Sequence, residues 1–180
     1  MKRKIFISIN LPARDKKRLI KASDKWSVLP VKWVKEQNLH ITLVFLGFTD
    51  DSAVEEICAK AKEASAGMEI FDVAFDRIEI GPTSEKQQLI WLTGEPNENL
   101  LRLVEKLEKE LGIFVSEKKS FRPHITLGRI RQRRWAALPE KPEISEKFPL
   151  TVAAETVDVM ASEFKNDGQE YTVIDSCPLK

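Results

Sequence analysis

The chain has 180 residues, of which 42% are hydrophobic, and its 29 lysines and arginines against 28 aspartates and glutamates leave a net charge of +1. This length predicts one domain, or two tightly joined lobes, with enough apolar residues for a real core. No apolar run approaches the roughly 20 residues of a membrane span, so we expect no membrane-spanning segment.

The first twelve residues combine three basic side chains with a short apolar stretch that ends at Asn10-Leu-Pro12. No small-residue cleavage site follows, so we expect a first strand over Ile5–Ile9 and no signal peptide. The only two cysteines, Cys58 and Cys177, could pair, but nothing in the sequence requires it. We expect free thiols in a reducing cytoplasm.

Three helices are predicted from apolar spacing and end signals. The first begins near Pro12, the second spans 51–63 with Asp50 or Asp51 near its cap, and the third spans 99–111 and ends at Gly112.

Two hairpins are predicted from β-branched runs and turn residues. One joins 69–80 to 86–93 across Gly81-Pro82, and the other joins 150–160 to 170–176 across Asn166-Asp-Gly168. The Pro-rich segment 139–149 is predicted to be a loop.

The only two histidines of the chain open the same four residues, His40-Ile-Thr-Leu and His124-Ile-Thr-Leu. Both runs are typical of buried strands, and alternation along a strand places each histidine on one face with the next threonine, Thr42 or Thr126. Because histidine titrates near neutral pH, two of them in matching contexts indicate a paired proton donor and acceptor.

The spacing of 84 residues between the histidines extends to other features. The same shift places Pro12 on Pro96, each just after an apolar strand candidate, Ile5–Ile9 or Leu89–Thr93. An internal repeat of this kind predicts an α+β fold of two pseudo-symmetric lobes within one domain over 1–180, with mainly antiparallel sheets and outer helices. The two histidine strands would then face a central cleft.

The charge is concentrated around the second histidine. Residues 114–135 contain seven basic side chains and one acidic one, a net +6 that leaves −5 on the rest of the chain. A solvated charged surface is the simpler interpretation, but beside a catalytic candidate the charge favours a phosphate-bearing substrate. The basic residues are Lys118, Lys119, Arg122, Arg129, Arg131, Arg133 and Arg134.

Other chemistries find less support. Zinc takes three or four protein ligands, and no further histidine or nearby cysteine accompanies the two motifs, so we expect no metal. The sequence has neither a Gly-x-Ser-x-Gly nucleophile motif nor a Gly-rich nucleotide loop. Structural histidines and ordinary strand threonines remain alternatives.

Two histidines, two hydroxyls and nearby arginines suit phosphodiester chemistry. One imidazole removes a proton from water and the other protonates the departing oxygen, while Thr42, Thr126 and an arginine hold the phosphate oxygens. Arg122 and Arg129 are the arginines that we expect to bind substrate. Strict alternation places Arg122 on the His124 face and Arg129 on the opposite face, unless a bulge at Gly128 re-aims it.

These motifs resemble those of the 2H phosphoesterase superfamily, in which two His-x-Thr-x motifs lie about 80 residues apart. The segments Ile5-Phe-Ile-Ser-Ile-Asn-Leu-Pro12 and Phe121-Arg-Pro-His-Ile-Thr-Leu-Gly-Arg129 are similar to one branch, the RNA 2′,3′-cyclic phosphodiesterases, also called 2′-5′ RNA ligases. The resemblance spans nearly the whole chain.

The resemblance implies a bilobal α+β fold, no metal or nucleotide cofactor, and hydrolysis of an RNA 2′,3′-cyclic phosphate to a 2′-phosphate with weak reverse ligation. His40 becomes the proton donor and His124 the acceptor. Thr42 and Thr126 become phosphate ligands, and Arg129 fills a family position five residues after the second histidine, which favours the bulge.

Two alternatives stay open at this point. One is a cyclic-phosphate hydrolase for a small nucleotide. The other is a non-catalytic RNA-end-binding protein that uses the basic segment and stacking aromatics such as Trp33 or Trp135. We expect RNA as the partner, with no membrane and no obligate protein partner.

Overall fold

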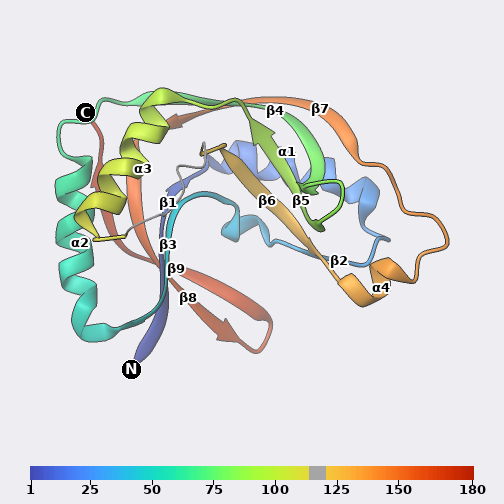
Figure 1. The fold of residues 1–180 in the computed structure, drawn as a ribbon, viewed down its shortest axis with the longest axis horizontal. Coiled ribbons are helices and arrows are strands. Elements are labelled where there is room, and N and C mark those ends of the chain that lie inside the picture. Colours follow the sequence, from blue (N-terminus) through green and yellow to red (C-terminus); the bar gives the residue numbers. More distant parts are fainter. Residues whose placement is uncertain (114–120) are drawn as a thin grey trace.

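Two antiparallel sheets form the framework of the protein, which a computed structural model describes over residues 1–113 and 121–180 (Figure 1). The four-stranded sheet has the order β3 (His40–Asp50), β1 (Lys2–Asn10), β8 (Thr156–Lys165), β9 (Gly168–Pro178). The five-stranded sheet has the order β2 (Val31–Trp33), β6 (His124–Ile130), β5 (Gln87–Gly94), β4 (Phe71–Pro82), β7 (Ser145–Ala154).

The two sheets repeat one arrangement. Each histidine strand pairs with the strand that opens its repeat, β3 with β1 and β6 with β5. The next two neighbours then follow in the same way, β8 and β9 in one sheet and β4 and β7 in the other. The predicted α+β fold with two related lobes is therefore confirmed.

The register of the repeat differs slightly from the sequence spacing. His40 lies opposite Asn10 on β1, and His124 lies opposite Thr93 on β5. The opening strands are thus equivalent at an offset of 83 residues, whereas the histidine strands keep the offset of 84.

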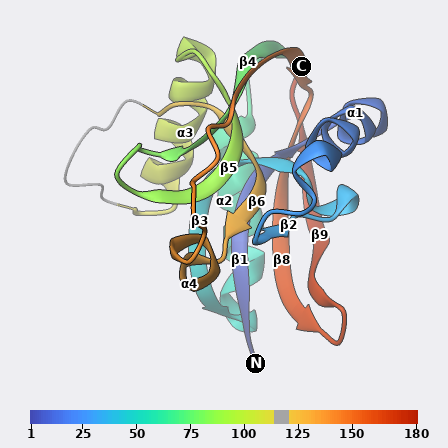
Figure 2. The same ribbon diagram turned by 90° about the vertical axis from the view of Figure 1, so that its right-hand side faces the viewer.

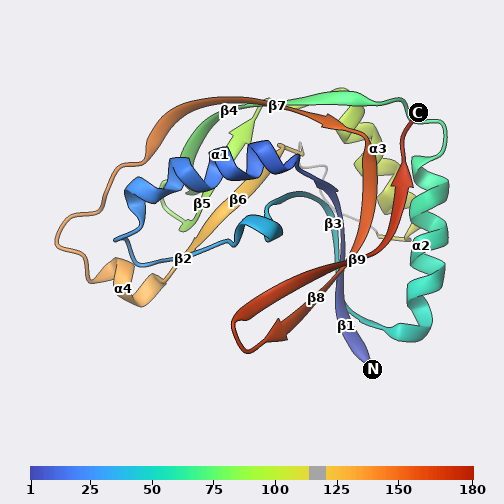
Figure 3. The same cartoon turned by 180° about the vertical axis from the view of Figure 1, so that it is seen from behind.

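The helices are α1 (Ala13–Ser23), α2 (Asp51–Ser65), α3 (Glu98–Glu110) and α4 (Gln132–Ala136), with short 3₁₀ turns η1 (Asp24–Trp26) and η2 (Glu36–Asn38). Helix α1 contacts β6 and α3 contacts β3, so each packs against the histidine strand of the other lobe. The two helices lie on opposite sides of the molecule (Figures 1 and 3). This crossed packing joins both lobes through one continuous core.

Helix ends follow local chemistry. Asn97 caps α3, because its side chain accepts a hydrogen bond from the Leu100 amide at 3.0 Å. Gly112, just after α3, has a φ of +67°, a conformation that glycine adopts without strain. The helix therefore begins one residue earlier than predicted and ends at Glu110, just before the predicted stop.

Two predictions about strands were wrong. Segment 150–160 is not one strand, because β7 ends in the five-stranded sheet and the chain turns at Glu155 into β8 of the four-stranded sheet. Gly81-Pro82 is not a turn, since both residues belong to β4 and the connection to β5 follows them. The predicted loop 139–149 also ends early, at the start of β7.

Within the described ranges, no helix is both long and apolar enough to cross a membrane. Cys58 and Cys177 are free thiols, as predicted, and burial raises the pKa of Cys177 to about 11.

Candidate active site

A cavity of about 400 Å³ is lined by residues of both sheets. Four predicted site residues line it: His40 and Thr42 from β3, and Thr126 and Arg129 from β6. The β8–β9 hairpin lies beside β2 (Figure 2), and residues of both its strands also line the cavity. The sequence motifs of the two lobes therefore meet at one site.

His40 is held on several sides. Its Nδ1 donates to the Asn38 carbonyl at 2.7 Å, and its Nε2 lies 2.8 Å from Thr42 Oγ1. The rings of Phe6 and Tyr171 pack against the imidazole at centroid distances of 5.0 and 5.4 Å. Because a carbonyl only accepts, Nδ1 keeps its proton and Nε2 is the nitrogen that gains or loses one.

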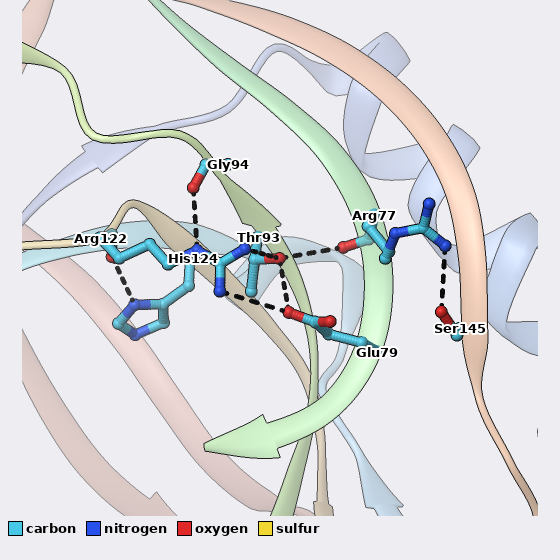
Figure 4. A network of polar contacts seen from close by, with 7 residues as sticks. All are labelled: Arg77, Glu79, Thr93, Gly94, Arg122, His124 and Ser145. Carbon is cyan, nitrogen blue, oxygen red and sulfur yellow. Dashed lines mark hydrogen bonds and ion pairs between the residues drawn. The ribbon is translucent and has the colours of Figure 1, made fainter. Parts of the chain in front are cut away.

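His124 has an equivalent support on the other lobe. Its Nδ1 donates to the Arg122 carbonyl at 3.2 Å (Figure 4), and its ring packs against Trp91 at a centroid distance of 4.9 Å. The supporting carbonyl belongs in both cases to the residue two positions before the histidine. His124 is not among the residues that line the cavity, but its charge acts on His40.

The surroundings lower the pKa of both imidazoles below the ordinary value of 6.5. For His40 the largest cause is burial, and the positive charges of His124, Lys16 and Arg129 lower its pKa further. For His124 burial again dominates. The hydrogen bond from each Nδ1 to its carbonyl favours the charged form and partly opposes these effects.

A β-bulge aims Arg129 at the cavity. Thr126 lies opposite Trp91 and Gly128 opposite Ile90, so Leu127 has no partner on β5 and alternation shifts by one residue. Arg129 therefore faces the same side as Thr126 and lines the cavity, whereas strict alternation would turn it away.

Arg122 does not line the cavity. Its guanidinium donates from Nε to the Gly94 carbonyl at 3.1 Å and from Nη2 to Thr93 Oγ1 at 3.3 Å, and it lies 3.6 Å from Glu79 Oε1 (Figure 4). The predicted contact of Arg122 with substrate remains a prediction.

The rest of the basic segment lies elsewhere. Arg131, Arg133 and Arg134 are exposed in and beside α4, and none lines the cavity. Lys118 and Lys119 fall outside the described residues. Trp135 is only 3% exposed and its indole donates to Gln87 Oε1, so the prediction that it could stack on RNA was wrong.

Sequence reasoning missed the aromatic wall of the site. Tyr171, Phe6 and Phe45 all line the cavity. Tyr171 is the only tyrosine of the chain, but its place beside His40 depends on β9 pairing with β8, which no local pattern reveals.

Metal ligands do not gather in the described part of the chain, where no three His, Cys, Asp or Glu side chains stand together as a candidate metal site. The chemistry that the described groups offer is proton transfer by two imidazoles and hydrogen bonding to an anion.

Comparison with known proteins gives a consistent family assignment. Residues 17–165 match the family model of the 2′-5′ RNA ligase superfamily. A Thermotoga maritima protein named RNA 2′,3′-cyclic phosphodiesterase is 29% identical over 153 residues, which cover 82% of this chain and 79% of that protein. A Bacillus subtilis protein of the same name is 27% identical over 88% of this chain and 84% of its own length.

Solved structures show the same fold. A crystal structure from Thermus thermophilus superposes with a TM-score of 0.83 and 25% identity over 98% of this chain and 97% of that one. The crystal structure of E. coli LigT complexed with phosphate gives 0.77 and 24% identity over 99% and 98% of the two chains. The likeness to LigT shows the fold alone.

Proposed function

The chain belongs to the 2′-5′ RNA ligase superfamily, and from this premise we propose that it hydrolyses the 2′,3′-cyclic phosphate at the end of an RNA to a 2′-phosphomonoester. The names of its relatives supply the reaction class. The observation that carries the proposal for this chain is the convergence of His40, Thr42, Thr126 and Arg129 on one cavity, with His124 close enough to shift the pKa of His40.

In the proposed reaction water attacks the phosphorus. His124 Nε2 takes the proton from the water as the new P–O bond forms. His40 Nε2 gives a proton to O3′ as the P–O3′ bond breaks, so the phosphate remains on the 2′ oxygen. The assignment of donor and acceptor follows the family resemblance.

Bound substrate would favour the protonated form of His40. A phosphodiester bound beside His40 would raise the pKa of its imidazole, opposing the burial and the cationic neighbours that lower it in the free protein. His40 would then carry a proton to donate when substrate is present.

The remaining polar groups would stabilise charge on the phosphate. Arg129 supplies a cation, and the hydroxyls of Thr42 and Thr126 can donate to the non-bridging oxygens. No step requires a metal. If the 5′-hydroxyl of a second RNA replaces water, the same proton transfers form a 2′-5′ linkage, which is the weak reverse ligation.

The test compares two substrates and identifies the product. An RNA oligonucleotide with a 2′,3′-cyclic phosphate end should be hydrolysed with a higher kcat/KM than a 2′,3′-cyclic mononucleotide, and phosphorus NMR should show a 2′-phosphate. A 3′-phosphate product would contradict the proposed bond cleavage. A clear preference for the mononucleotide would favour a small-nucleotide hydrolase, and RNA binding without turnover would favour an end-binding protein.

Arg129 and Arg133 form a matched pair within this test. Arg129 lines the cavity, whereas Arg133 is exposed on α4. Arg129→Ala should lower kcat/KM by about 10-fold or more, since charge-assisted hydrogen bonds contribute about 1.5–3 kcal/mol. Arg133→Ala should change kcat/KM little. Equal effects of the two substitutions would show that Arg129 does not contact the substrate.

A further inference from the structure

The face of the four-stranded sheet that carries His40 also carries exposed aromatic rings. Phe45, Phe48 and Phe164 are 62%, 69% and 80% exposed. Rings of this size are normally buried, so a group of them on one face indicates a binding surface.

The strand register shows that these rings share the cavity's face. Phe45 lies opposite Phe6, and Phe48 lies opposite Lys4. Residues directly opposite each other project to the same side of a sheet, and both Phe6 and Lys4 line the cavity. Phe45 and Phe48 therefore extend the cavity along β1 and β3, away from His40.

Spacing along this face suits successive nucleotides. Thr42, Phe45 and Phe48 lie opposite Ser8, Phe6 and Lys4, which are two residues apart on β1. Such rows follow one another at about 6.8 Å. A phosphate at Thr42 thus has one exposed ring in the next row and a second ring one row further.

Phe164 lies at the far end of the same face. Ser162, two residues earlier on β8, lines the cavity, and alternation turns Phe164 the same way. Lys32 of the other sheet places its Nζ 5.4 Å from the centroid of this ring.

Phe45 occupies the position in its lobe that Arg129 occupies in the other lobe. Strand β3 contains the same bulge as β6, because Ser8 lies opposite Thr42 and Ile7 opposite Val44. Phe45 is thus the third residue after one motif threonine, as Arg129 is after the other. One lobe directs a cation at the cavity, and the other directs a phenyl ring.

The charges on this face select the chemistry of the ligand. Lys4 Nζ lies 5.1 Å from the Phe48 ring centroid. Across residues 1–113 and 121–180, no carboxylate forms a salt bridge with Lys4, Lys32 or Arg129. Flat apolar rings beside cations that form no salt bridge with a described carboxylate match the bases and phosphates of a single strand.

We propose that this face binds the single-stranded RNA that precedes the cyclic end, with Phe45 and Phe48 stacking successive bases and Lys4 and Lys32 contacting the phosphates. The direction of the strand rests on the proposed function, because it assumes that the reactive end lies at His40. The incoming base replaces Lys4 over the Phe48 ring and frees the ammonium to pair with phosphate.

The experiment measures Phe48→Ala, with Phe48→Tyr as the conservative variant and Val28→Ala as the control. Val28 is 90% exposed, precedes β2 in the chain and is not among the residues that line the cavity. For each protein, kcat/KM is measured on a cyclic-ended RNA hexamer and on a 2′,3′-cyclic mononucleotide, and Kd is measured for a hexamer with a 3′-hydroxyl end.

The ratio of hexamer to mononucleotide kcat/KM should fall at least about 5-fold in Phe48→Ala, since stacking contributes on the order of 1–3 kcal/mol per base. The Kd of the 3′-hydroxyl hexamer should rise by a similar factor. Phe48→Tyr should restore both values, and Val28→Ala should match the wild type.

An unchanged ratio and Kd in Phe48→Ala would overturn the RNA path. Concentration-dependent sedimentation of the wild type that Phe48→Ala abolishes, with RNA binding unaffected, would instead identify a protein interface and also overturn it. If neither cyclic substrate is hydrolysed but Phe48→Ala still weakens hexamer binding, the proposed function fails and the RNA-binding face stands.

Discussion

Arg122 should position His124, and its replacement should separate this role from contact with substrate. Its side chain joins Gly94, Thr93 and Glu79, while its own carbonyl accepts the hydrogen bond from His124 Nδ1 (Figure 4). The backbone nearby is fixed as well, because the Gly94 amide donates to the Pro123 carbonyl at 3.1 Å. Arg122→Ala removes the side-chain bonds and loosens the segment that orients the imidazole.

The size of the effect follows from these contacts. A hydrogen bond to a charged group contributes about 1.5–3 kcal/mol, but the Arg122 side chain is 50% exposed, so solvent screening reduces its share. Thr93 keeps a bond to Glu79 at 2.9 Å after the change. We therefore expect a loss of about 1 kcal/mol in the free energy of unfolding and a fall of about 10-fold in kcat. That fall is smaller than the roughly 100-fold expected when an imidazole is removed.

The assay is steady-state hydrolysis of a cyclic-ended oligonucleotide, with urea unfolding on the same proteins. A positioning role predicts a lower kcat with KM nearly unchanged, and no recovery in Arg122→Lys, which keeps the charge but loses the planar guanidinium. Glu79→Gln should affect kcat non-additively with Arg122→Ala, since the two residues share one network. A raised KM, a weaker salt dependence and recovery by lysine would refute this reasoning and establish contact with a substrate phosphate.

Three further outcomes follow from the same geometry. His40→Ala and His124→Ala should each lower kcat by at least about 100-fold with unfolding curves like the wild type, and near-normal turnover by either would remove that imidazole from the mechanism. Since burial lowers the pKa of both histidines, the plot of kcat/KM against pH should be bell-shaped and already falling above about pH 6.5. The plot of kcat, which is measured with the phosphodiester bound, should peak at a higher pH. A flat profile would contradict this. Gly128→Ala should lower the free energy of unfolding in urea by about 1–3 kcal/mol and lower kcat/KM through Arg129, because the added Cβ would lie 3.0 Å from Trp33 Cε3 and closer still to Val31 Cγ1, both on β2. Wild-type stability would show that β2 shifts to accommodate the methyl group.

Local patterns predicted most of the elements that carry the site. The two motifs predicted strands with each histidine and threonine on one face, and the sequence repeat predicted two related sheets. These features depend on the spacing of residues along the chain, which can be read directly from the sequence.

Features that depend on pairing between distant segments were harder to predict. Strand-forming residues lie on both sides of Glu155, so the sequence does not show that the chain leaves one sheet for the other there. The orientation of Arg129 depends on how Ile90 and Trp91 of β5 pair across the bulge. Tyr171 reaches His40 only because β9 pairs with β8.

The most direct test of the central claim is hydrolysis of a cyclic-ended RNA oligonucleotide by the purified protein, with and without EDTA, from pH 5 to 8. If two imidazoles transfer the protons, the wild type should give the 2′-phosphate at the same rate and with the same pH profile under both conditions, and His40→Ala and His124→Ala should be inactive under both. Activity lost in EDTA and restored by zinc or manganese would contradict the account, and would make the two histidines metal ligands.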